Sequence, residues 1–457
     1  MMNIQETVQK QKLYFQKGNT FPVSSRIKAL KALLAAVNAW EDKILAALRS
    51  DLNKSPAEAY MTEIGMVKEE ISFQLKHLKK FAAKKRVKTP LAQFKAKSYT
   101  YPAPYGVVLI MSPWNYPFQL TLAPLADAIA AGNCAVVKPS AYAPKTAQVI
   151  ADLLKETFDP DHIAVILGGR AENTELIQQK YDMIFFTGGS STGRVVAEAA
   201  AKNLTPVVLE LGGKSPCIVN EDANIPLAAK RIAFGKFLNA GQTCVAPDYV
   251  LVHRSVHAAF LEALETHIIN MYGENALTNP DYPKIVNAKH FARILSLVAP
   301  DKIVFGGDSD ESALKIAPTV LDGVTFTDRV MSEEIFGPVL PVIEFESYGQ
   351  IAAAIAHHPT PLALYYFGKD SDLKQRILRE IQFGGGCVND TIIHLATTRM
   401  GFGGVGESGM GAYHGERGFF AFSHVKSIVE KSTAIDIQLR YAPYNDKKTA
   451  QLKKFLR

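Results

Sequence analysis

Between residues 105 and 211, short apolar runs alternate with segments of helical periodicity, and this alternation is the strongest constraint on the fold. The expected strands cover residues 106–111, 134–137, 163–167, 183–187 and 206–211, and the expected helices include residues 119–131, a segment from Pro144 and residues 192–203. Consecutive parallel strands need a crossover connection, which is usually a helix. The alternation therefore predicts a parallel sheet with helices on its faces, and such sheets bind ligands beyond the carboxyl ends of their strands.

A second alternating run extends from residue 224 to about residue 395. It contains expected helices over residues 226–237 and 256–271, around an expected strand over residues 249–252. We therefore predict an α/β protein with two doubly wound parallel-sheet domains and a small β-rich element. The predicted limits are 1–84 and 105–211 for the first domain, 212–398 for the second, 85–104 and 399–440 for the β-rich element, and 441–457 for a basic tail.

The remaining N-terminal sequence differs in character from these runs. Residues 1–85 are expected to be helical, because residues 24–48 and 61–81 carry apolar residues at helical spacing. Residues 84–104 are first basic and then β-prone, and Pro102 and Pro104 are expected to break the strand. This stretch is interpreted as an extended arm or a hairpin.

Composition excludes several classes of protein. With 47% hydrophobic and 21% charged residues, the chain is not a disordered protein. Its net charge of +7 is mild for 457 residues and predicts no nucleic-acid partner. The basic cluster near the C-terminus is expected to be a solvated tail, and its members are Lys447, Lys448, Lys453, Lys454 and Arg457.

Neither a membrane span nor a metal site is indicated. No run approaches the roughly 18 apolar residues of a spanning helix, and the N-terminal segment lacks the apolar core of a signal peptide. The four cysteines show no CxxC spacing, so a disulfide framework is not expected. No pattern of Cys and His residues suggests a metal. We therefore expect a cytoplasmic protein with no membrane anchor and no metal.

A glycine-rich turn separates the expected strand 183–187 from the expected helix 192–203. The sequence from Phe185 to Gly193 is Phe-Phe-Thr-Gly-Gly-Ser-Ser-Thr-Gly. A turn at the start of a helix presents free N–H groups to a phosphate. The match is incomplete, because Ser190 replaces the second glycine of a dinucleotide fingerprint. From the pattern alone, an ordinary tight turn remains an alternative.

Four further residues could carry chemistry. Cys244 lies in a Gly-Gln-Thr-Cys loop after a helix, where a free thiol is either a nucleophile or a small buried hydrophobe. Glu210 ends an apolar strand, where its carboxyl would have a raised pKa and could act as a general base or join an ion pair. Asn115 and Lys138 each follow a strand and could bind an oxyanion and a ribose or phosphate, or belong to a plain loop and a solvated surface.

Together these motifs resemble those of the aldehyde dehydrogenase superfamily, in the same order and over nearly the whole chain. The segments that carry the resemblance are Pro-Trp-Asn at 113–115, Phe-Thr-Gly at 186–188, Glu-Leu-Gly-Gly-Lys at 210–214, Gly-Gln-Thr-Cys at 241–244 and Glu-Glu-Ile-Phe-Gly-Pro at 333–338. The flanking residues 239–249, 403–415 and 440–448 are most similar to the class 3 group of dimeric, NAD(P)-dependent enzymes. The resemblance implies a cofactor-binding first domain, a catalytic second domain and an oligomerisation role for the β-rich element.

The resemblance also implies a role for each candidate residue. Cys244 matches the nucleophile, Glu210 the general base and Asn115 the side-chain donor of the oxyanion hole. The residues that match cofactor contacts are Lys138 at the adenosine ribose, Gly188, Gly189, Ser190 and Gly193 at the phosphates, and Leu211, Glu334 and Phe336 at the nicotinamide and its ribose. The residues near the substrate tunnel are Tyr116, Phe234, Ile392 and Phe402. The implied reaction oxidises an aldehyde, medium-chain aliphatic or aromatic, to the carboxylic acid with NAD or NADP through a cysteine thiohemiacetal and thioester.

One position departs from the family pattern. Many members carry a glutamate three residues after the lysine, where its carboxylate binds the 2′-hydroxyl of the ribose, but this chain has Ala141. Without that carboxylate, NAD loses an acceptor and the 2′-phosphate of NADP loses a repulsive neighbour. We therefore expect NADP to be used about as well as NAD.

The same residues bear on two alternative functions and on the oligomeric state. A CoA-acylating relative would pass the thioester to CoA and typically lacks the general base, whereas Glu210 is present. A crystallin-like relative would keep the fold without turnover, although every catalytic position is intact. The β-prone residues 97–101 and the C-terminal segment suggest strand exchange in a homodimer. The sequence does not indicate the physiological aldehyde.

Overall fold

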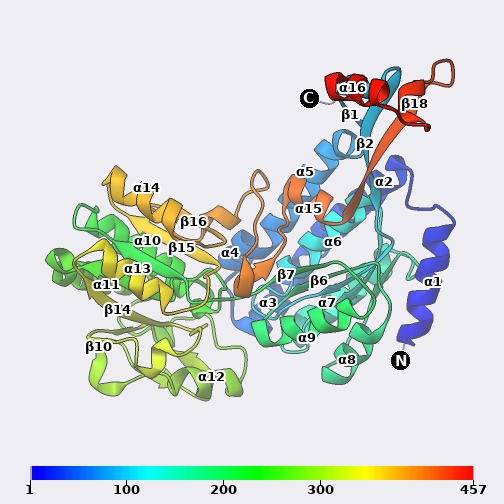
Figure 1. Ribbon diagram of the computed structural model, residues 1–457. Coiled ribbons are helices and arrows are strands. Elements are labelled where there is room, and N and C mark those ends of the chain that lie inside the picture. Colours follow the sequence, from blue (N-terminus) through cyan, green and yellow to red (C-terminus); the bar gives the residue numbers. More distant parts are fainter. Residues whose placement is uncertain (1–2, 456–457) are drawn as a thin grey trace.

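The computed structural model describes residues 3–455, and Figure 1 shows two sheet-containing domains side by side with a thinner projection at one end. The predicted α/β fold with two largely parallel sheets is confirmed. The chain leaves the first sheet after Glu210 and enters the second at Pro216. The predicted limits of the domains remain a prediction.

The first sheet has six strands in the order β17-β7-β6-β3-β4-β5. Its strands are β3 (Val107–Met111), β4 (Cys134–Lys138), β5 (Ile163–Val165), β6 (Met183–Thr187), β7 (Val207–Glu210) and β17 (Gly409–Met410). Every residue of β3, β4 and β6 is buried, as expected for strands that helices cover on both faces. Only the edge strand β17 within this sheet runs antiparallel, a detail that the alternation of strands and helices did not predict.

Helices from the N-terminal part of the chain pack around this sheet. They are α1 (Ile4–Gln16), α2 (Val23–Ala39), α3 (Glu41–Leu52), α4 (Pro56–Ala59), α5 (Gly65–Phe81), α6 (Gln119–Ala131), α7 (Pro144–Thr157), α8 (Arg170–Gln178) and α9 (Ser190–Ala201). The expected helical character of residues 24–48 is confirmed, although the backbone breaks at Trp40 and divides the segment between α2 and α3. The predicted helix 61–81 begins with a π-helical turn over Tyr60–Ile64 before α5. Periodicity alone does not reveal such breaks, since both flanking helices bury the same kind of apolar stripe.

The second sheet has seven strands in the order β10-β13-β14-β9-β8-β15-β16. Its strands are β8 (Pro216–Val219), β9 (Tyr249–His253), β10 (Ile303–Phe305), β13 (Thr319–Leu321), β14 (Val339–Phe345), β15 (Ala363–Phe367) and β16 (Gly385–Val388), and a separate two-stranded sheet pairs β11 (Ser309–Asp310) with β12 (Lys315–Ile316). The accompanying helices are α10 (Ile225–Phe237), α11 (His257–Tyr272), α12 (Ala288–Leu295), α13 (Tyr348–Ala356) and α14 (Ser371–Glu380). The edge strand β10 is antiparallel to β13, and the other pairings in the sheet are parallel.

The projection in Figure 1 is a three-stranded antiparallel sheet of β1 (Lys85–Val87), β2 (Ala96–Pro104) and β18 (Ser423–Lys431). The expectation that Pro102 and Pro104 break the strand was wrong, because β2 continues through both prolines. β18 pairs with β2 along all nine residues, whereas β1 pairs only with residues 98–100. Since the two prolines are two positions apart, their missing N–H groups face the same side of β2, where no neighbouring strand needs them.

The C-terminal residues are mostly exposed, as expected for a solvated tail, and most of them form a helix. Helix α15 (Gly415–Ala421) packs on α6 and leads into β18, and residues Asp446–Phe455 form α16 at the tip of the projection (Figure 1). The ammonium group of Lys448 donates hydrogen bonds to the backbone oxygens of Tyr441 and Pro443, which holds the segment before the helix. Arg457 of the predicted basic cluster lies outside the described residues.

Residues 3–455 also bear on the expectations about a membrane span, a metal and the cysteines. No helix there is long and apolar enough to cross a membrane. No group of three or more His, Cys, Asp or Glu side chains is arranged to hold a metal ion. The four cysteines, all within the described part, are free thiols, and Cys134 and Cys217 are fully buried in strands.

Candidate active site

Four neighbouring strands of the first sheet deliver candidate residues to one edge. β7 ends at Glu210 and β4 ends at Lys138, while the loops after β3 and β6 carry Asn115 and the turn 188–193. β7, β6, β3 and β4 are adjacent in this order and parallel, and Thr187 pairs with Glu210 across the last positions of β6 and β7. This carboxyl edge is where sheets of this class bind ligands.

Cys244 reaches this edge from the second domain and lies where two cavities meet. The first cavity is a cleft with about 1210 Å³ of empty space. The predicted residues that line it are Asn115, Gly188, Gly189, Ser190, Glu210, Leu211, Cys244, Glu334 and Phe336. Lys138 and Gly193 are not among the residues that line this cleft.

The second cavity is a tunnel with about 780 Å³ of empty space. Its walls include the predicted tunnel residues Tyr116, Phe234, Ile392 and Phe402. Residues that the sequence did not indicate complete the walls, and they include Met61, Thr62, Met66, Leu238, Leu395 and Ala396. The Tyr116 hydroxyl is paired with the hydroxyl of Thr243 at 2.5 Å, so the tunnel presents mainly carbon atoms to a ligand.

The loop that carries Cys244 has an unusual backbone. Asn239 and Ala240 both adopt left-handed φ angles, of 52° and 51°, and Gly241 follows with a φ of 73°. A β-carbon on Gly241 would lie 2.2 Å from the backbone oxygen of Gly337, so this position requires glycine. This strained turn follows α10 directly and sets where the Cys244 side chain enters the site.

The environment of Cys244 favours the neutral thiol. Burial, with the negative charges of Glu334 and Glu210 added, raises the pKa of this thiol to about 12. Hydrogen bonds from the backbone N–H groups of Cys244 and Val245 act in the opposite direction. The thiolate is the reactive form, so a cation near the sulfur would increase its reactivity.

Glu210 is buried, with 2% of its surface exposed. Among the residues that the structure describes, neither carboxylate oxygen has a hydrogen-bond partner, so the ion pair considered from the sequence is not formed. Burial raises the pKa of this carboxyl well above its usual value. A carboxylate with a raised pKa is a stronger base than an exposed one, and its free oxygens can approach a water molecule.

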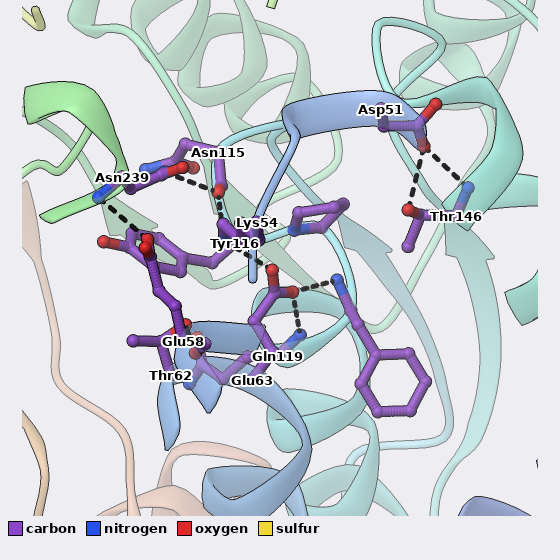
Figure 2. Close-up of polar contacts among 12 residues, drawn as sticks. Asp51, Lys54, Glu58, Thr62, Glu63, Asn115, Tyr116, Gln119, Thr146 and Asn239 are labelled. Carbon is purple, nitrogen blue, oxygen red and sulfur yellow. Dashed lines mark hydrogen bonds and ion pairs between the residues drawn. The ribbon is translucent and has the colours of Figure 1, made fainter. Parts of the chain in front are cut away.

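Asn115 is buried and held by its neighbours (Figure 2). Its side-chain nitrogen donates to the backbone oxygen of Gln242 at 3.0 Å, which uses one of its two N–H groups. Its backbone oxygen accepts from Lys54 and from Asn239, each at 2.9 Å. The second N–H of the side chain remains available to a ligand in the cleft that Cys244 also lines.

The turn 188–193 begins α9 in a manner that suits a phosphate. Gly189 is the residue before the helix and provides no side-chain cap, so the first N–H groups of α9 have no such partner. The N–H of Gly188 instead donates to the backbone oxygen of Glu210. A β-carbon on Gly193 would lie 2.6 Å from a methyl carbon of Leu211, so this glycine lets α9 pack against the residue after β7. Uncapped N–H groups beside an open cleft fit a dinucleotide diphosphate.

Glu334 and Phe336 face this turn from the second domain. The Phe336 backbone has a φ of 48°, and its ring packs edge-on against Trp114 with centroids 5.3 Å apart. Burial and the charge of Asp248 raise the pKa of Glu334 to about 8. The segment is anchored by Lys214, which pairs with Asp248 at 2.5 Å and donates to the backbone oxygen of Glu333.

Lys138 lies deeper than expected for a solvated lysine. It is buried at the end of β4, and its ammonium donates to the backbone oxygen of Pro139 at 2.8 Å. Burial lowers the pKa of this ammonium to about 8. The neighbouring Ala141 is exposed and has no side-chain polar group.

Comparison with known proteins identifies the family to which the chain belongs. A model of the aldehyde dehydrogenase family matches residues 2–428. The chain belongs to this family. It is 49% identical over 438 residues to the 4,4'-diaponeurosporen-aldehyde dehydrogenase of Staphylococcus aureus, across 95% of each chain. It is 41% identical over 446 residues to the dimeric, NADP-preferring aldehyde dehydrogenase of the dog Canis lupus familiaris, across 97% of this chain and 98% of that one.

A solved structure agrees with these relatives. The substrate-bound state of Staphylococcus aureus AldH has a TM-score of 0.98 and 47% identity, over 100% of both chains. The resemblance that the motifs indicated is therefore confirmed. The protein is an aldehyde dehydrogenase that oxidises aldehydes to carboxylic acids with NAD or NADP. These relatives give no support to the CoA-acylating or the non-catalytic alternative.

Several residues of the site were not indicated by the sequence. Lys54, Glu63 and Asn239 hold the backbone around Asn115, and each is fully buried. His414 contributes to the tunnel wall from the residue before α15. Glu63 lies in a helical segment with several other polar residues, so the sequence carries no local signal that singles it out.

Proposed function

We propose that this aldehyde dehydrogenase acts on apolar aldehydes, medium-chain aliphatic or aromatic, with Cys244 as the nucleophile. The observation that carries the proposal is the position of Cys244 between the apolar tunnel and the cleft. A hydrocarbon tail would occupy the tunnel with its carbonyl group at the sulfur. Burial of each methylene contributes about 0.8 kcal/mol, so chain length should increase affinity until the tunnel is filled.

In the first step, the Cys244 thiol loses its proton to water in the cleft, and the resulting thiolate attacks the carbonyl carbon to form a thiohemiacetal anion. The negative charge that develops on oxygen is stabilised by the free N–H of the Asn115 side chain and by the backbone N–H of Cys244. Departure of hydride from the same carbon leaves a thioester on the sulfur. When bound, oxidised NAD(P) supplies the hydride acceptor for this step.

In the second step, Glu210 removes a proton from water and directs the resulting hydroxide to the thioester carbon. The carbon–sulfur bond breaks, and the carboxylic acid leaves. The raised pKa of Glu210 and its unpaired oxygens support this role. A buried general base of this kind typically contributes a factor of about 10²–10⁴ in rate.

The cleft residues would hold the cofactor along the carboxyl edge of the first sheet. Residues 188–193 would bind its diphosphate, and Lys138 would reach the adenosine ribose. Leu211, Glu334 and Phe336 would contact the nicotinamide and its ribose. The exposed Ala141 supports use of NADP as well as NAD, because no carboxylate there repels a 2′-phosphate.

The enzyme would work as a homodimer in the cytoplasm. β18 is a nine-residue edge strand of the projecting sheet and exposes apolar residues such as Val425 and Val429. Exposed edges of this kind pair with other chains. A relative whose name includes the word dimeric supports the same assembly. Sedimentation that gives only a monomer would exclude the dimer.

The four free thiols support the proposed location, because the cytoplasm is a reducing compartment.

Formation of reduced cofactor tests the proposed chemistry. Purified protein would receive hexanal or benzaldehyde with NAD or NADP, and absorbance of the reduced nicotinamide would be followed. Loss of the signal in Cys244→Ala, with the carboxylic acid formed in the absence of CoA by the unmodified enzyme, is the expected result. Turnover that persists in Cys244→Ala would exclude this cysteine as the nucleophile.

A further inference from the structure

A fully buried ion pair lies beside the site without touching the cleft. The ammonium of Lys54 is 2.6 Å from a carboxylate oxygen of Glu63, and both side chains are 0% exposed (Figure 2). Burying two charges costs roughly as much solvation energy as their attraction returns, so such pairs contribute little net stability. The function of the pair is therefore better sought in the backbone groups that its two charges hold in place.

The lysine end of the pair holds the residue that bears the proposed oxyanion donor. Lys54 donates to the backbone oxygen of Asn115 at 2.9 Å, and its ammonium lies 3.9 Å from the ring centroid of Tyr116. Asn239 donates to the same backbone oxygen at 2.9 Å. Two buried donors, one of them charged, thus fix a single carbonyl group.

The glutamate end holds the other side of the same loop. One oxygen of Glu63 accepts from the backbone N–H groups of Phe118, at 2.8 Å, and Gln119, at 3.2 Å. These residues begin α6, where an anion also interacts favourably with the helix dipole. Lys54 and Glu63 therefore clamp residues 115–119 at both ends.

The clamp extends to the loop of the nucleophile. Glu58 lies between the two charged residues in the sequence and accepts from the backbone N–H of Asn239 at 2.9 Å. Asn239 belongs to the strained turn that precedes Cys244. The segment from Lys54 to Glu63 thus contacts both loops that would supply the oxyanion hole, and Figure 2 shows its three charged side chains directed toward them.

The π-helical turn explains how one short segment serves two surfaces. Glu63 lies within the turn Tyr60–Ile64 and points toward the start of α6, whereas Met61 and Thr62 of the same turn line the tunnel. π-turns are rare and occur frequently at functional sites. The extra residue in the turn lets neighbouring side chains face the clamp and the tunnel.

We infer that Lys54 and Glu63 are positioning residues that set the geometry of the oxyanion hole through Asn115. The inference rests on the proposed role of Asn115 as an oxyanion donor. With its carbonyl fixed and one side-chain N–H given to Gln242, the other N–H has one orientation. A shift of about 1 Å in a catalytic group can cost about 100-fold in rate, so a loosened clamp should slow formation of the thioester.

A double-mutant cycle with Asn115→Ala tests this inference. Lys54→Met/Glu63→Gln removes both charges together, which avoids leaving one charge buried without a partner. The single-turnover rate of reduced-cofactor formation should fall about tenfold, less than the roughly 10²–10³-fold expected for loss of the donor itself. In the Asn115→Ala background, the same pair of changes should lower the rate less than about twofold, because the donor that they position is already absent.

Asp51→Asn provides the matched control. Asp51 is also a buried carboxylate at a helix N-terminus, since it accepts from the N–H and hydroxyl of Thr146 at the start of α7, and it contacts neither the clamp nor the cavities. This control should lower the unfolding temperature and leave the single-turnover rate unchanged. If Lys54→Met/Glu63→Gln does not fold, Glu63→Gln alone, which keeps an acceptor for the two N–H groups, should give a smaller fall with the same dependence on Asn115.

Each outcome separates this inference from the proposed function. Equal losses in the presence and absence of the Asn115 side chain would overturn the positioning role while leaving the donor in place. A rate unaffected by Asn115→Ala would overturn both the donor role and the inference. An unmodified enzyme without aldehyde-dependent turnover would overturn the proposed function itself. A rise in the KM for hexanal with an unchanged single-turnover rate would also contradict the inference, since it would indicate a change in the tunnel alone.

Discussion

Gly212 and Glu334 are packed closely together, since a β-carbon on Gly212 would lie 2.0 Å from a carboxylate oxygen of Glu334. Gly212→Ala should therefore displace the glutamate from the end of the cleft where we propose that the nicotinamide binds. We expect the dissociation constant for NAD to rise about tenfold, which corresponds to about 1.4 kcal/mol. Titration of cofactor by calorimetry would measure it.

Gly349→Ala is the control for this change. Gly349 lies within α13 and has only one atom, 3.8 Å away, near the position of a β-carbon. Replacing an unhindered glycine in a helix should leave cofactor binding unchanged and stabilise the fold by up to about 1 kcal/mol. Equal cofactor affinity in Gly212→Ala and the unmodified enzyme would mean that Glu334 does not depend on this contact.

Glu210→Gln should separate the two proposed steps. The amide cannot remove a proton from water, but attack by Cys244 and hydride transfer need no base at this position. We expect a burst of about one reduced cofactor per active site, followed by turnover at least about 10²-fold slower than in the unmodified enzyme. Stopped-flow absorbance would show the burst, and mass spectrometry would show the acyl group on the protein. Steady turnover at the normal rate would assign the base to another residue.

The sequence predicted those parts of the site that follow from local patterns. Glu210 and Lys138 were expected at strand ends, and both lie there because alternating strands and helices leave few other topologies. The turn 188–193 was expected between a strand and a helix, and it occupies that place. Their roles in the reaction were inferred from the family motifs. The periodicity of apolar residues predicts strands and helices but not the chemical role of a side chain.

The parts that could not be predicted depend on contacts between distant residues. Lys54 and Asn115 are 61 positions apart, and Glu63 and Phe118 are 55 apart. No local spacing encodes such pairs, because they depend on how α5 and α6 pack. The π-turn was equally hidden, since it lies at the start of the predicted segment 61–81 and leaves the apolar spacing of α5 intact. Buried polar residues within the helical segments were therefore the places where pattern reasoning failed.

Ala141→Glu should change the choice of cofactor. A carboxylate at this exposed position would repel the 2′-phosphate of NADP and could accept from the 2′-hydroxyl of NAD. We expect kcat/KM with NADP to fall about tenfold or more, which is a typical cost of an unfavourable charge contact of about 1.4 kcal/mol, while kcat/KM with NAD is kept. Initial rates with both cofactors measure the ratio. A kcat/KM with NADP that is already about 100-fold below that with NAD in the unmodified enzyme would contradict the inference from Ala141.

Alkylation of Cys244 should depend strongly on pH when no cofactor is bound. Burial and the nearby carboxylates raise the pKa of this thiol to about 12, so the thiolate fraction is small near neutrality and rises with each pH unit. The rate of labelling by iodoacetamide should increase from about pH 7 to about pH 10 without a plateau. Mass spectrometry of the peptide that contains Cys244 would follow it, with the half-buried Cys387 as a second thiol in the same sample. A plateau below about pH 8 would show that another group stabilises the thiolate.

Glu58 should make the stability of the enzyme depend on pH in a defined direction. Burial raises the pKa of its carboxyl to about 7 in the folded protein. In the unfolded chain a glutamate has a pKa near 4.3, so between about pH 4.5 and pH 7 the folded state holds more protons than the unfolded state. The free energy of unfolding must therefore fall as pH rises through this window. Glu58→Gln carries no titrating group and can still accept from the N–H of Asn239.

The difference in unfolding free energy between Glu58→Gln and the unmodified enzyme should consequently change with pH. We expect the substitution to become more stabilising by about 1–2 kcal/mol on going from about pH 5 to about pH 8, an amount reduced from the full pKa shift because the side chain is only partly buried. Urea unfolding of both proteins at the two pH values measures this change. Glu156→Gln, at an exposed carboxyl on α7, should show no such dependence. A difference in unfolding free energy that stays constant between the two pH values would show that Glu58 is already ionised at about pH 5 in the folded protein. The charged carboxylate would then be the form that accepts from Asn239.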